Sequence, residues 1–285
     1  MSGHSNLQRR LDVALTAAWR HAADARRVVA RRGSAQTALQ SLGSPARSDP
    51  EAWDEALAGR HADYRSAHPM VQGRVGIVCV SMRPGLLDAV VSNIAGQVDV
   101  DLDVVFVANS ADFDMQVVER AFADVPQTAV LHPPAGTSLG AALNLAMAKT
   151  DARFVAKFDD DDLYGPHFLA DSLRAHGYAG AGVVGKHTYY ARMATTGSTY
   201  LRFPRNEFRY SGTLAGGTLV IDRDRVGEQR FEDISLGEDR AFLARCHRRG
   251  LSTFSADRFN FVQMRTGSNT WALPDEAFLE GAAVV

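Results

Sequence analysis

The sequence predicts an α/β fold with a mainly parallel central sheet and helices on both faces, preceded by a helical extension. From Arg74 onward, short apolar runs rich in β-branched residues alternate with longer segments of helical periodicity, which is the pattern of repeated strand–helix–strand units. The first seventy residues lack such strand-like runs and show helical periodicity alone. We therefore expect a helical N-terminal extension over residues 1–70 and an α/β domain over residues 71–285.

The composition is that of a soluble globular enzyme, with 46% hydrophobic and 22% charged residues. The formal net charge of −2 gives no reason to expect nucleic acid as a partner. Cys79 and Cys246 are isolated, which favours two reduced packing thiols over a disulfide or a metal site. No apolar run could cross a bilayer and no signal-peptide core is present, so we expect a cytoplasmic protein, with a peripheral position at the inner membrane face as an alternative.

The N-terminal extension is expected to contain two helices. Leu7, Leu11 and Leu15 recur at helical spacing, and this amphipathic pattern ends near Gly33. Residues 50–66 form the second expected helix, with an Asp-Pro pair at its start. We interpret the extension as a packing or homo-oligomerisation arm, and the alternative is a basic surface that touches a membrane or a polyanionic acceptor. Deleting residues 1–66 should then change oligomeric state or solubility more than donor chemistry.

The α/β domain is expected to begin with four strands and the helices that connect them. Strands are predicted over residues 75–80, 102–107, 129–131 and 154–156, and helices over 86–96, 115–123, 138–148 and 163–176. Further along, we expect strands over 183–185, 218–221 and 259–265, a helix over 241–249, and an irregular stretch over 201–210. The crossovers between parallel strands should be right-handed.

Four consecutive aspartates, Asp159 to Asp162, follow the fourth expected strand. Adjacent carboxylates repel and raise one another's pKa unless a cation lies among them. In an open α/β sheet, ligands bind at the carboxyl ends of the strands. Mg²⁺ and Mn²⁺ are commonly held there by one or two carboxylates, with water and substrate phosphates completing the shell. The alternative is a solvated acidic loop, or acids that favour the first turn of the helix expected from Leu163.

The order of these motifs resembles the nucleotide-sugar glycosyltransferases of the GT-A fold, family 2 type, from about Arg74 to Trp271. The motifs that carry the resemblance are Ser81-x-Arg83-Pro84, Asn109-Ser110-x-Asp112, Leu139-Gly140-x-x-Leu143-Asn144 and the acid run continuing to Gly165-Pro166. The acid run is similar to that of capsule or cell-wall polysaccharide transferases. The resemblance implies transfer of a sugar, with inversion, from a nucleoside diphosphate sugar to a hydroxyl of a saccharide or glycoconjugate acceptor.

The resemblance also implies a donor site. Asp159 and Asp161 would hold Mn²⁺ or Mg²⁺ against the donor diphosphate. Asn109 stands where the family has an acid facing the base or ribose, so uridine, guanosine and thymidine donors all stay open, with a UDP-sugar favoured. The residues expected to bind the donor are Ser81, Arg83, Pro84, Asn109, Asn144, Asp159, Asp160, Gly217 and Arg265. For Ser81 and Arg83 the alternative is an ordinary strand-end turn, and for Gly217 a tight turn before a strand.

The pair Glu238-Asp239 resembles the catalytic Glu-Asp motif of the family, in which the aspartate is the general base. A sugar hydroxyl is a poor nucleophile until a positioned base accepts its proton. The alternative is that both acids stabilise the first turn of the following helix. Asn269 stands where the family often has a histidine, which puts a third protein metal ligand in doubt. Trp271 is interpreted as a core or loop anchor, and the alternative is a platform on which a sugar stacks.

Two other classes of function stay open. A nucleotidyltransferase on a related sheet is one, although no glycine-rich signature follows the first strand. A non-catalytic glycan- or metal-binding scaffold is the other, favoured by the replaced acid at Asn109 and the replaced histidine at Asn269. Nucleotide binding with and without Mn²⁺ would separate the three.

Overall fold

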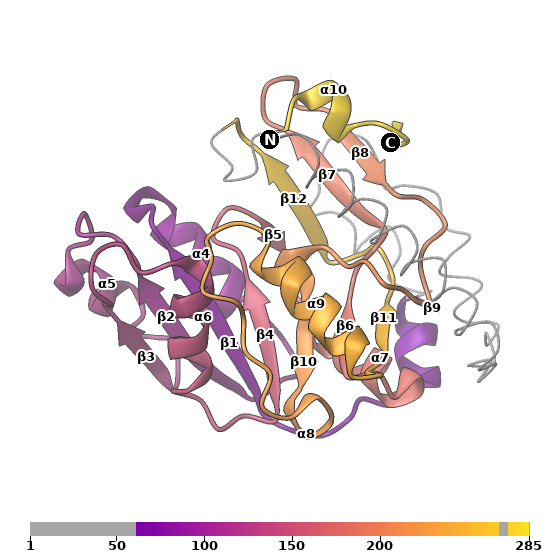
Figure 1. Ribbon diagram of the computed structural model, residues 1–285, viewed down its shortest axis with the longest axis horizontal. Helices are drawn as coiled ribbons and strands as arrows, with labels where there is room; N and C mark the ends of the chain where they lie inside the picture. Colours follow the sequence, from indigo (N-terminus) through magenta and orange to yellow (C-terminus); the bar gives the residue numbers. More distant parts are fainter. Residues whose placement is uncertain (1–60, 268–272, 285) are drawn as a thin grey trace.

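The computed structural model of the chain describes residues 61–267 and 273–284. Within these ranges it contains an eight-stranded sheet and a five-stranded sheet. In Figure 1 the larger sheet forms the body of the molecule and the smaller sheet lies above one end of it. The described residues include no helix long and apolar enough to cross a membrane.

The larger sheet has the strand order β3-β2-β1-β4-β10-β6-β11-β9. Strand β1 pairs in parallel with β2 and β4, whereas β10 runs antiparallel to β4 and β6. The mainly parallel sheet expected from the sequence is therefore confirmed. Its strands are β1 (Val75–Ser81), β2 (Leu102–Ala108), β3 (Thr128–Leu131), β4 (Phe154–Phe158), β6 (Val183–Gly185), β9 (Arg209–Tyr210), β10 (Val220–Asp222) and β11 (Thr253–Ser255).

The smaller sheet has the order β13-β8-β7-β12-β5. Its strands are β5 (Leu163–Tyr164), β7 (Tyr189–Met193), β8 (Thr199–Arg202), β12 (Phe261–Arg265) and β13 (Ala283–Val284). The helices are α4 (Leu87–Ala95), α5 (Met115–Ala121), α6 (Leu139–Met147), α7 (Phe168–Ala179), α8 (Arg223–Val226), α9 (Glu238–Arg248) and α10 (Asp275–Phe278), with the 3-10 turns η2 (Pro84–Leu86) and η3 (Gly216–Thr218).

Helices cover both faces of the larger sheet because its strands alternate their buried side chains. Ile77 and Cys79 of β1 pack with α4, α5 and α7 on one face. Val78, between them, packs with α6 and α9 on the other face. Both faces are apolar, as expected for a parallel sheet that is buried on both sides.

The expected helix over 163–176 is wrong at its start. Leu163 and Tyr164 form strand β5, which pairs antiparallel with Val262 and Phe261 of β12, and the helix begins only at Phe168. Gly165 passes so close to Asn260 that a Cβ would lie 2.6 Å from the amide oxygen. Pro166 follows and disfavours a helical conformation at Gly165. Tertiary pairing therefore decides the conformation of a segment whose local pattern favours a helix.

Strands β7 and β8 are absent from the sequence-based prediction. Each is short, and their central residues Tyr190, Ala191, Tyr200 and Leu201 pair across an antiparallel ladder. The expected irregular stretch over 201–210 contains the end of β8 and all of β9. Helix α9 begins at Glu238, three residues before the expected start at 241.

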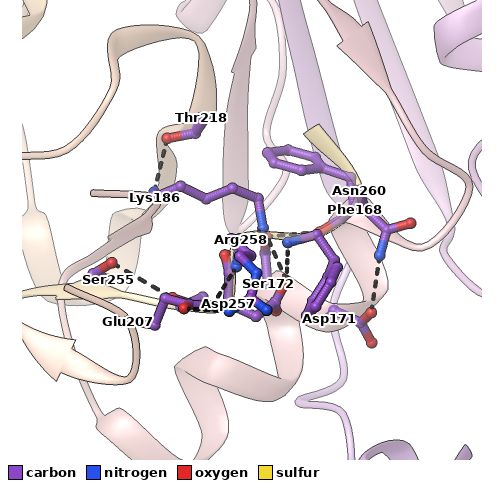
Figure 2. Close-up of polar contacts among 12 residues, drawn as sticks. Phe168, Asp171, Ser172, Lys186, Glu207, Thr218, Ser255, Asp257, Arg258 and Asn260 are labelled. Carbon is purple, nitrogen blue, oxygen red and sulfur yellow. Dashed lines mark hydrogen bonds and ion pairs between the residues drawn. The ribbon is translucent and has the colours of Figure 1, made fainter. Parts of the chain in front are cut away.

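A buried polar network joins the two sheets. The Nζ of Lys186, which follows β6, donates to the carbonyl oxygen of Asp257 at 2.9 Å and lies 3.3 Å from its carboxylate. Arg258 donates to Glu207 at 2.8 Å. Figure 2 shows these side chains converging between the strands. Because each charge is paired, the network fixes the connections from β6 to β7 and from β11 to β12 without leaving a bare buried ion.

Residues 61–67 are helical and belong to the packed domain, upstream of the boundary expected at residue 70. Tyr64 is fully buried, and its hydroxyl lies 3.0 Å from that of Tyr178. Arg65 forms a bidentate pair with Asp171, with N–O distances of 3.0 and 2.9 Å. The rest of the expected N-terminal helices lies outside the described residues. A deletion of residues 1–66 would thus remove two groups from the domain itself.

Substitutions at Tyr64, which is far from the acid run in the sequence, should strongly affect the stability of the fold. Tyr64→Ala should lower the free energy of unfolding by about 3–5 kcal/mol, because it empties a fully buried aromatic site. Tyr64→Phe keeps the ring and should cost about 1 kcal/mol for the lost hydroxyl pair. Urea denaturation of the full chain measures both. Equal stability of the alanine variant and the wild type would show that this segment is not part of the core.

Candidate active site

Four chain segments meet at one edge of the larger sheet. Strands β1 and β4 are parallel, so Ser81 and Asp159 leave the sheet at the same edge. Strand β10 runs the opposite way, so the Gly216–Thr218 turn enters the sheet at that edge. Figure 1 shows the N-terminal end of α9 directed toward this edge. The motifs from four parts of the sequence are therefore brought together, as expected at a ligand-binding edge.

The loop after β1 is tied to the acid run. Ser81 Oγ donates to Asp160 Oδ2 at 2.5 Å. Arg83 donates through two nitrogens to Asp160, and through Nη1 to Asp161 Oδ2 at 2.9 Å. Burial lowers the pKa of Arg83, but hydrogen bonds to Asp160 and the charges of both acids outweigh it and raise the pKa above its ordinary value. Pro84 opens the 3-10 turn η2, where its missing N–H is tolerated.

Lys157 links the acid run to the Glu-Asp motif. Its ammonium is buried, with Nζ 2.5 Å from Asp159 Oδ1 and 3.7 Å from Glu238 Oε1. Burial alone would lower the pKa of Lys157, but the surrounding carboxylates, Asp159 first, raise it above its ordinary value. The lysine is therefore a fixed positive charge between two motifs that are 79 residues apart in the sequence, from Asp159 to Glu238.

The other acids are crowded and partly buried. Burial and then the charges of Asp159 and Asp161 raise the pKa of Asp162. Burial also raises the pKa of Asp161, against the opposing effect of Arg83. Asp162 Oδ1 accepts a hydrogen bond from the backbone N–H of Met264 at 2.9 Å, which fixes the run against β12. Four of the six carboxyl groups, at Asp159, Asp160, Asp161 and Glu238, thus form ion pairs with Arg83 or Lys157, and Asp162 and Asp239 lie beside them.

Two glycines allow the acids of different motifs to approach one turn. A Cβ on Gly217 would lie 2.8 Å from Asp159 Oδ2 and 3.0 Å from Asp162 Oδ2. A Cβ on Gly216 would lie only 2.0 Å from Asp239 Oδ2. No side chain larger than glycine fits at Gly216 unless the Asp239 carboxylate moves. The Gly216–Gly217 turn therefore lies against Asp159 and Asp162 at Gly217 and against Asp239 at Gly216.

Glu238 and Asp239 open helix α9 and differ in environment. Gly237 precedes them with a φ of 83°, in the left-handed region that favours glycine. Glu238 is buried beside Lys157, and burial raises its pKa against the opposing effect of that lysine. Asp239 is half-buried, and its Oδ1 accepts a hydrogen bond from the backbone N–H of Arg240 at 2.6 Å. Both acids lie in the first helical turn, where negative charge is also stabilised by the helix dipole.

The acid run fits a cation whose shell is completed by substrate. Among the described residues, no cluster of three or more His, Cys, Asp or Glu side chains is arranged to enclose a metal ion. Hard cations such as Mg²⁺ need only one or two protein carboxylates when phosphates and water supply the other ligands. Crowded carboxylates with raised pKa values are the groups that such a cation would stabilise.

Asn109 and Asn144 have structural partners. The Nδ2 of Asn109 donates to the carbonyl oxygen of Thr137 at 3.0 Å, which ties the loop after β2 to the start of α6. The amide of Asn144 both donates to and accepts from the backbone of Phe231, at 2.9 Å each. Gly140 packs against the same loop, where a Cβ would overlap the carbonyl oxygen of Glu232. The α6 motif therefore holds the segment that leads to Glu238, and a donor contact by either amide stays a prediction.

Arg265 lies one residue after Met264 and faces the C-terminal segment. It donates to the carbonyl oxygen of Leu273, lies 3.6 Å from Asp275, and its guanidinium packs 5.0 Å from the centre of the Phe278 ring. A role in binding diphosphate stays a prediction. Asn269 and Trp271 lie outside the described residues.

Two contributors to the site were missed from the sequence. Lys157 lies two residues before Asp159 in the sequence, but its contact with Glu238 arises only when the end of β4 and the start of α9 come together. The Tyr164 hydroxyl accepts from the N–H of Asp159 at 2.8 Å and donates to the carbonyl oxygen of Gly217 at 2.7 Å. An aromatic residue two positions after the last acid is the sequence signal for it, but the expected helix over 163–176 places Tyr164 on the wrong element.

The chain resembles known proteins at the level of family and of fold. The profile described as Glycosyl transferase family 2 matches residues 77–227, just over half of the 285 residues. The fold is similar to that of the mannosyltransferase PcManGT from Pyrobaculum calidifontis in complex with GDP-Man and Mn²⁺, with 16% identity and a TM-score of 0.56 over 79% of this chain and 70% of that chain. It is also similar to S. aureus TarS 1-349 in complex with UDP-GlcNAc, with 17% identity and a TM-score of 0.54 over 73% of this chain and 64% of that chain. No curated protein matches the sequence.

Removing the buried ammonium of Lys157 should destabilise the folded protein. Lys157→Met should lower the free energy of unfolding by about 3 kcal/mol, because it leaves Asp159 and Glu238 without their shared cation. This value is at the low end of the range for breaking a buried ion pair, because Asp159 is partly exposed to solvent, which screens its charge. Urea denaturation of the variant measures it.

Lys149→Met is the matched control, since Lys149 is exposed and should change stability by less than about 0.5 kcal/mol. Adding Glu238→Gln to Lys157→Met should recover part of the loss. A Lys157→Met protein as stable as the control would mean that the acids do not depend on this ammonium.

Proposed function

The chain belongs to glycosyl transferase family 2, and from that premise we propose that it transfers a sugar from a nucleoside diphosphate sugar to a hydroxyl of a saccharide or glycoconjugate acceptor, with inversion at the anomeric carbon. The observation that carries the proposal is the Gly216–Gly217 turn, which lies against Asp159 and Asp162 at Gly217 and against Asp239 at Gly216. A donor sugar over this turn would lie close both to the acids proposed to hold the cation of its diphosphate and to the carboxylate proposed as the base.

Asp239 serves as the general base in this proposal. The acceptor hydroxyl oxygen attacks the anomeric carbon from the side opposite the diphosphate, and Asp239 accepts the hydroxyl proton as the new bond forms. The bond from the anomeric carbon to the diphosphate oxygen breaks in the same displacement. Glu238 is less suited to this role because it is buried and paired with Lys157. It would position Asp239 by fixing the first turn of α9.

Asp159 and Asp161 would hold a divalent cation, which would neutralise charge on the leaving diphosphate. Ser81 and Arg83 keep the acid run in place by holding Asp160. Arg265 is proposed to add positive charge on the diphosphate side. It would do so by exchanging its bond to the Leu273 carbonyl for the phosphate.

The donor base stays open among uridine, guanosine and thymidine. The two similar structures hold GDP-Man in one case and UDP-GlcNAc in the other, and Mn²⁺ accompanies GDP-Man in the first. We propose Mn²⁺ or Mg²⁺ for this chain and retain a UDP-sugar as the favoured donor. A non-catalytic scaffold is the second candidate, since Asn109 stands in place of the expected acid and is bonded to Thr137.

Nucleotide binding should depend on the cation and on Asp161. Isothermal titration calorimetry with UDP and GDP should show at least about tenfold tighter binding with Mn²⁺ than with EDTA, a difference of about 1.4 kcal/mol. Asp161→Ala should remove most of that difference, because the cation would lose one of its carboxylate ligands and would hold the diphosphate less tightly. Asp124→Ala removes an exposed acid remote in sequence and is the control. Equal affinities in EDTA and Mn²⁺ would reject the metal site.

Asp239→Asn should separate an enzyme from a scaffold. The amide keeps the size of the side chain but not its basicity, so transfer or donor hydrolysis should fall about a hundred- to ten-thousandfold while nucleotide affinity is kept. Radiolabelled or coupled nucleotide-release assays measure the rate, and calorimetry measures the affinity. If the variant keeps activity within a few-fold of the Asp124→Asn control, Asp239 is only a helix-start residue.

A further inference from the structure

The loop between β8 and β9 has an unusual backbone. Phe203, Arg205 and Phe208 adopt positive φ values of 45°, 70° and 50°, a region that bulky residues rarely occupy. Thr188 holds the loop, because its hydroxyl donates to the carbonyl oxygen of Phe203 at 2.6 Å and accepts from the N–H of Asn206 at 3.0 Å. Such local strain persists where the surrounding structure enforces it, which is common at binding sites.

The strained loop presents one aromatic ring to solvent. Phe203 is 38% exposed, whereas Arg202 before it and Phe208 after it are buried. The Arg202 guanidinium lies 4.4 Å from the centre of the Phe203 ring. The ring of His187 lies 5.4 Å away at 56°, and its Nδ1 is 2.8 Å from the Ser211 hydroxyl. Phe203 is therefore an exposed ring whose position is fixed by neighbours on more than one side.

A short series of contacts links this ring to the turn that lies against Asp239. His187 follows Lys186, whose carbonyl oxygen accepts from the N–H of Ala215 at 2.8 Å. Ala215 precedes Gly216, which touches the Asp239 carboxylate. Figure 2 shows the start of the connection after β6, with the N–H of Lys186 bonded to Thr218 on the same turn. His187, Lys186 and Ala215 thus connect Phe203 to Gly216 past the end of β6.

We propose that Phe203, braced by His187 and Arg202, is a stacking subsite for a sugar unit of the acceptor beyond the unit that reacts. The inference rests on the proposed glycosyl transfer and adds to it that the acceptor is an oligosaccharide chain. The C–H face of a pyranose ring is apolar and flat enough to pack on an exposed aromatic ring, whose face carries partial negative charge. Fixing the ring in advance reduces the entropy that binding would otherwise cost.

The test uses the full chain on an array of mono- to hexasaccharides, with UDP or GDP and Mn²⁺ present. Wild type should bind longer saccharides more tightly than the matching monosaccharides. Phe203→Ala should weaken binding of the longer ones roughly tenfold, the factor given by about 1.4 kcal/mol of stacking. Phe203→Tyr should restore it. Leu145→Ala, which removes an exposed apolar side chain from α6, should bind as wild type does.

Phe203→Gly separates loss of the aromatic ring from loss of stability, because glycine adopts the positive φ of this position without strain. This variant should unfold at a temperature no lower than Phe203→Ala and should still lose the preference for longer saccharides. Mn²⁺-dependent nucleotide affinity is measured in parallel, so that failure of the donor site is seen separately. If nucleotide binding is intact, two results would overturn the subsite. One is equal saccharide binding by wild type and both variants, and the other is no saccharide binding by wild type.

Discussion

The buried ammonium of Lys157 is the contact on which the site depends. It lies between Asp159 at the end of β4 and Glu238 at the start of α9, so one charge fixes a strand from the first half of the domain to a helix from the second. Arg83, in the loop after β1, forms ion pairs with Asp160 and Asp161 and so fixes that loop to the acid run. Six carboxyl groups around two basic side chains leave an excess of negative charge. A divalent cation with a diphosphate fits that excess better than a diphosphate alone, which the acids would repel.

Close backbone approach is the second requirement of this arrangement. Gly216 and Gly217 let acids from two motifs meet one turn, and Gly140 lets helix α6 pack against the loop that leads to α9. Asn144 holds the same loop through the Phe231 backbone. The α6 motif thus holds the loop that leads to Glu238 and Asp239 in place.

Much of the larger sheet could be predicted because its strands are short, apolar and separated by helices of clear periodicity, as in 75–81 and 102–108. The smaller sheet could not, because pairs such as Leu163 with Val262 depend on residues far apart in the chain. The acids could be proposed as site residues from their order along the sequence. Their supports could not, because the contacts of Lys157 with Glu238 and of Asn144 with Phe231 arise only when distant elements pack.

The central claim is that the acid run at the end of β4 holds a divalent cation against a donor diphosphate. Anomalous X-ray diffraction from crystals grown with Mn²⁺ and UDP or GDP tests it most directly. The account predicts one manganese peak bonded to Asp161 or Asp159 and to a phosphate oxygen, with Asp239 across the Gly216–Gly217 turn. A nucleotide bound at this edge without manganese, with the Arg83 and Lys157 ion pairs unchanged, would contradict it.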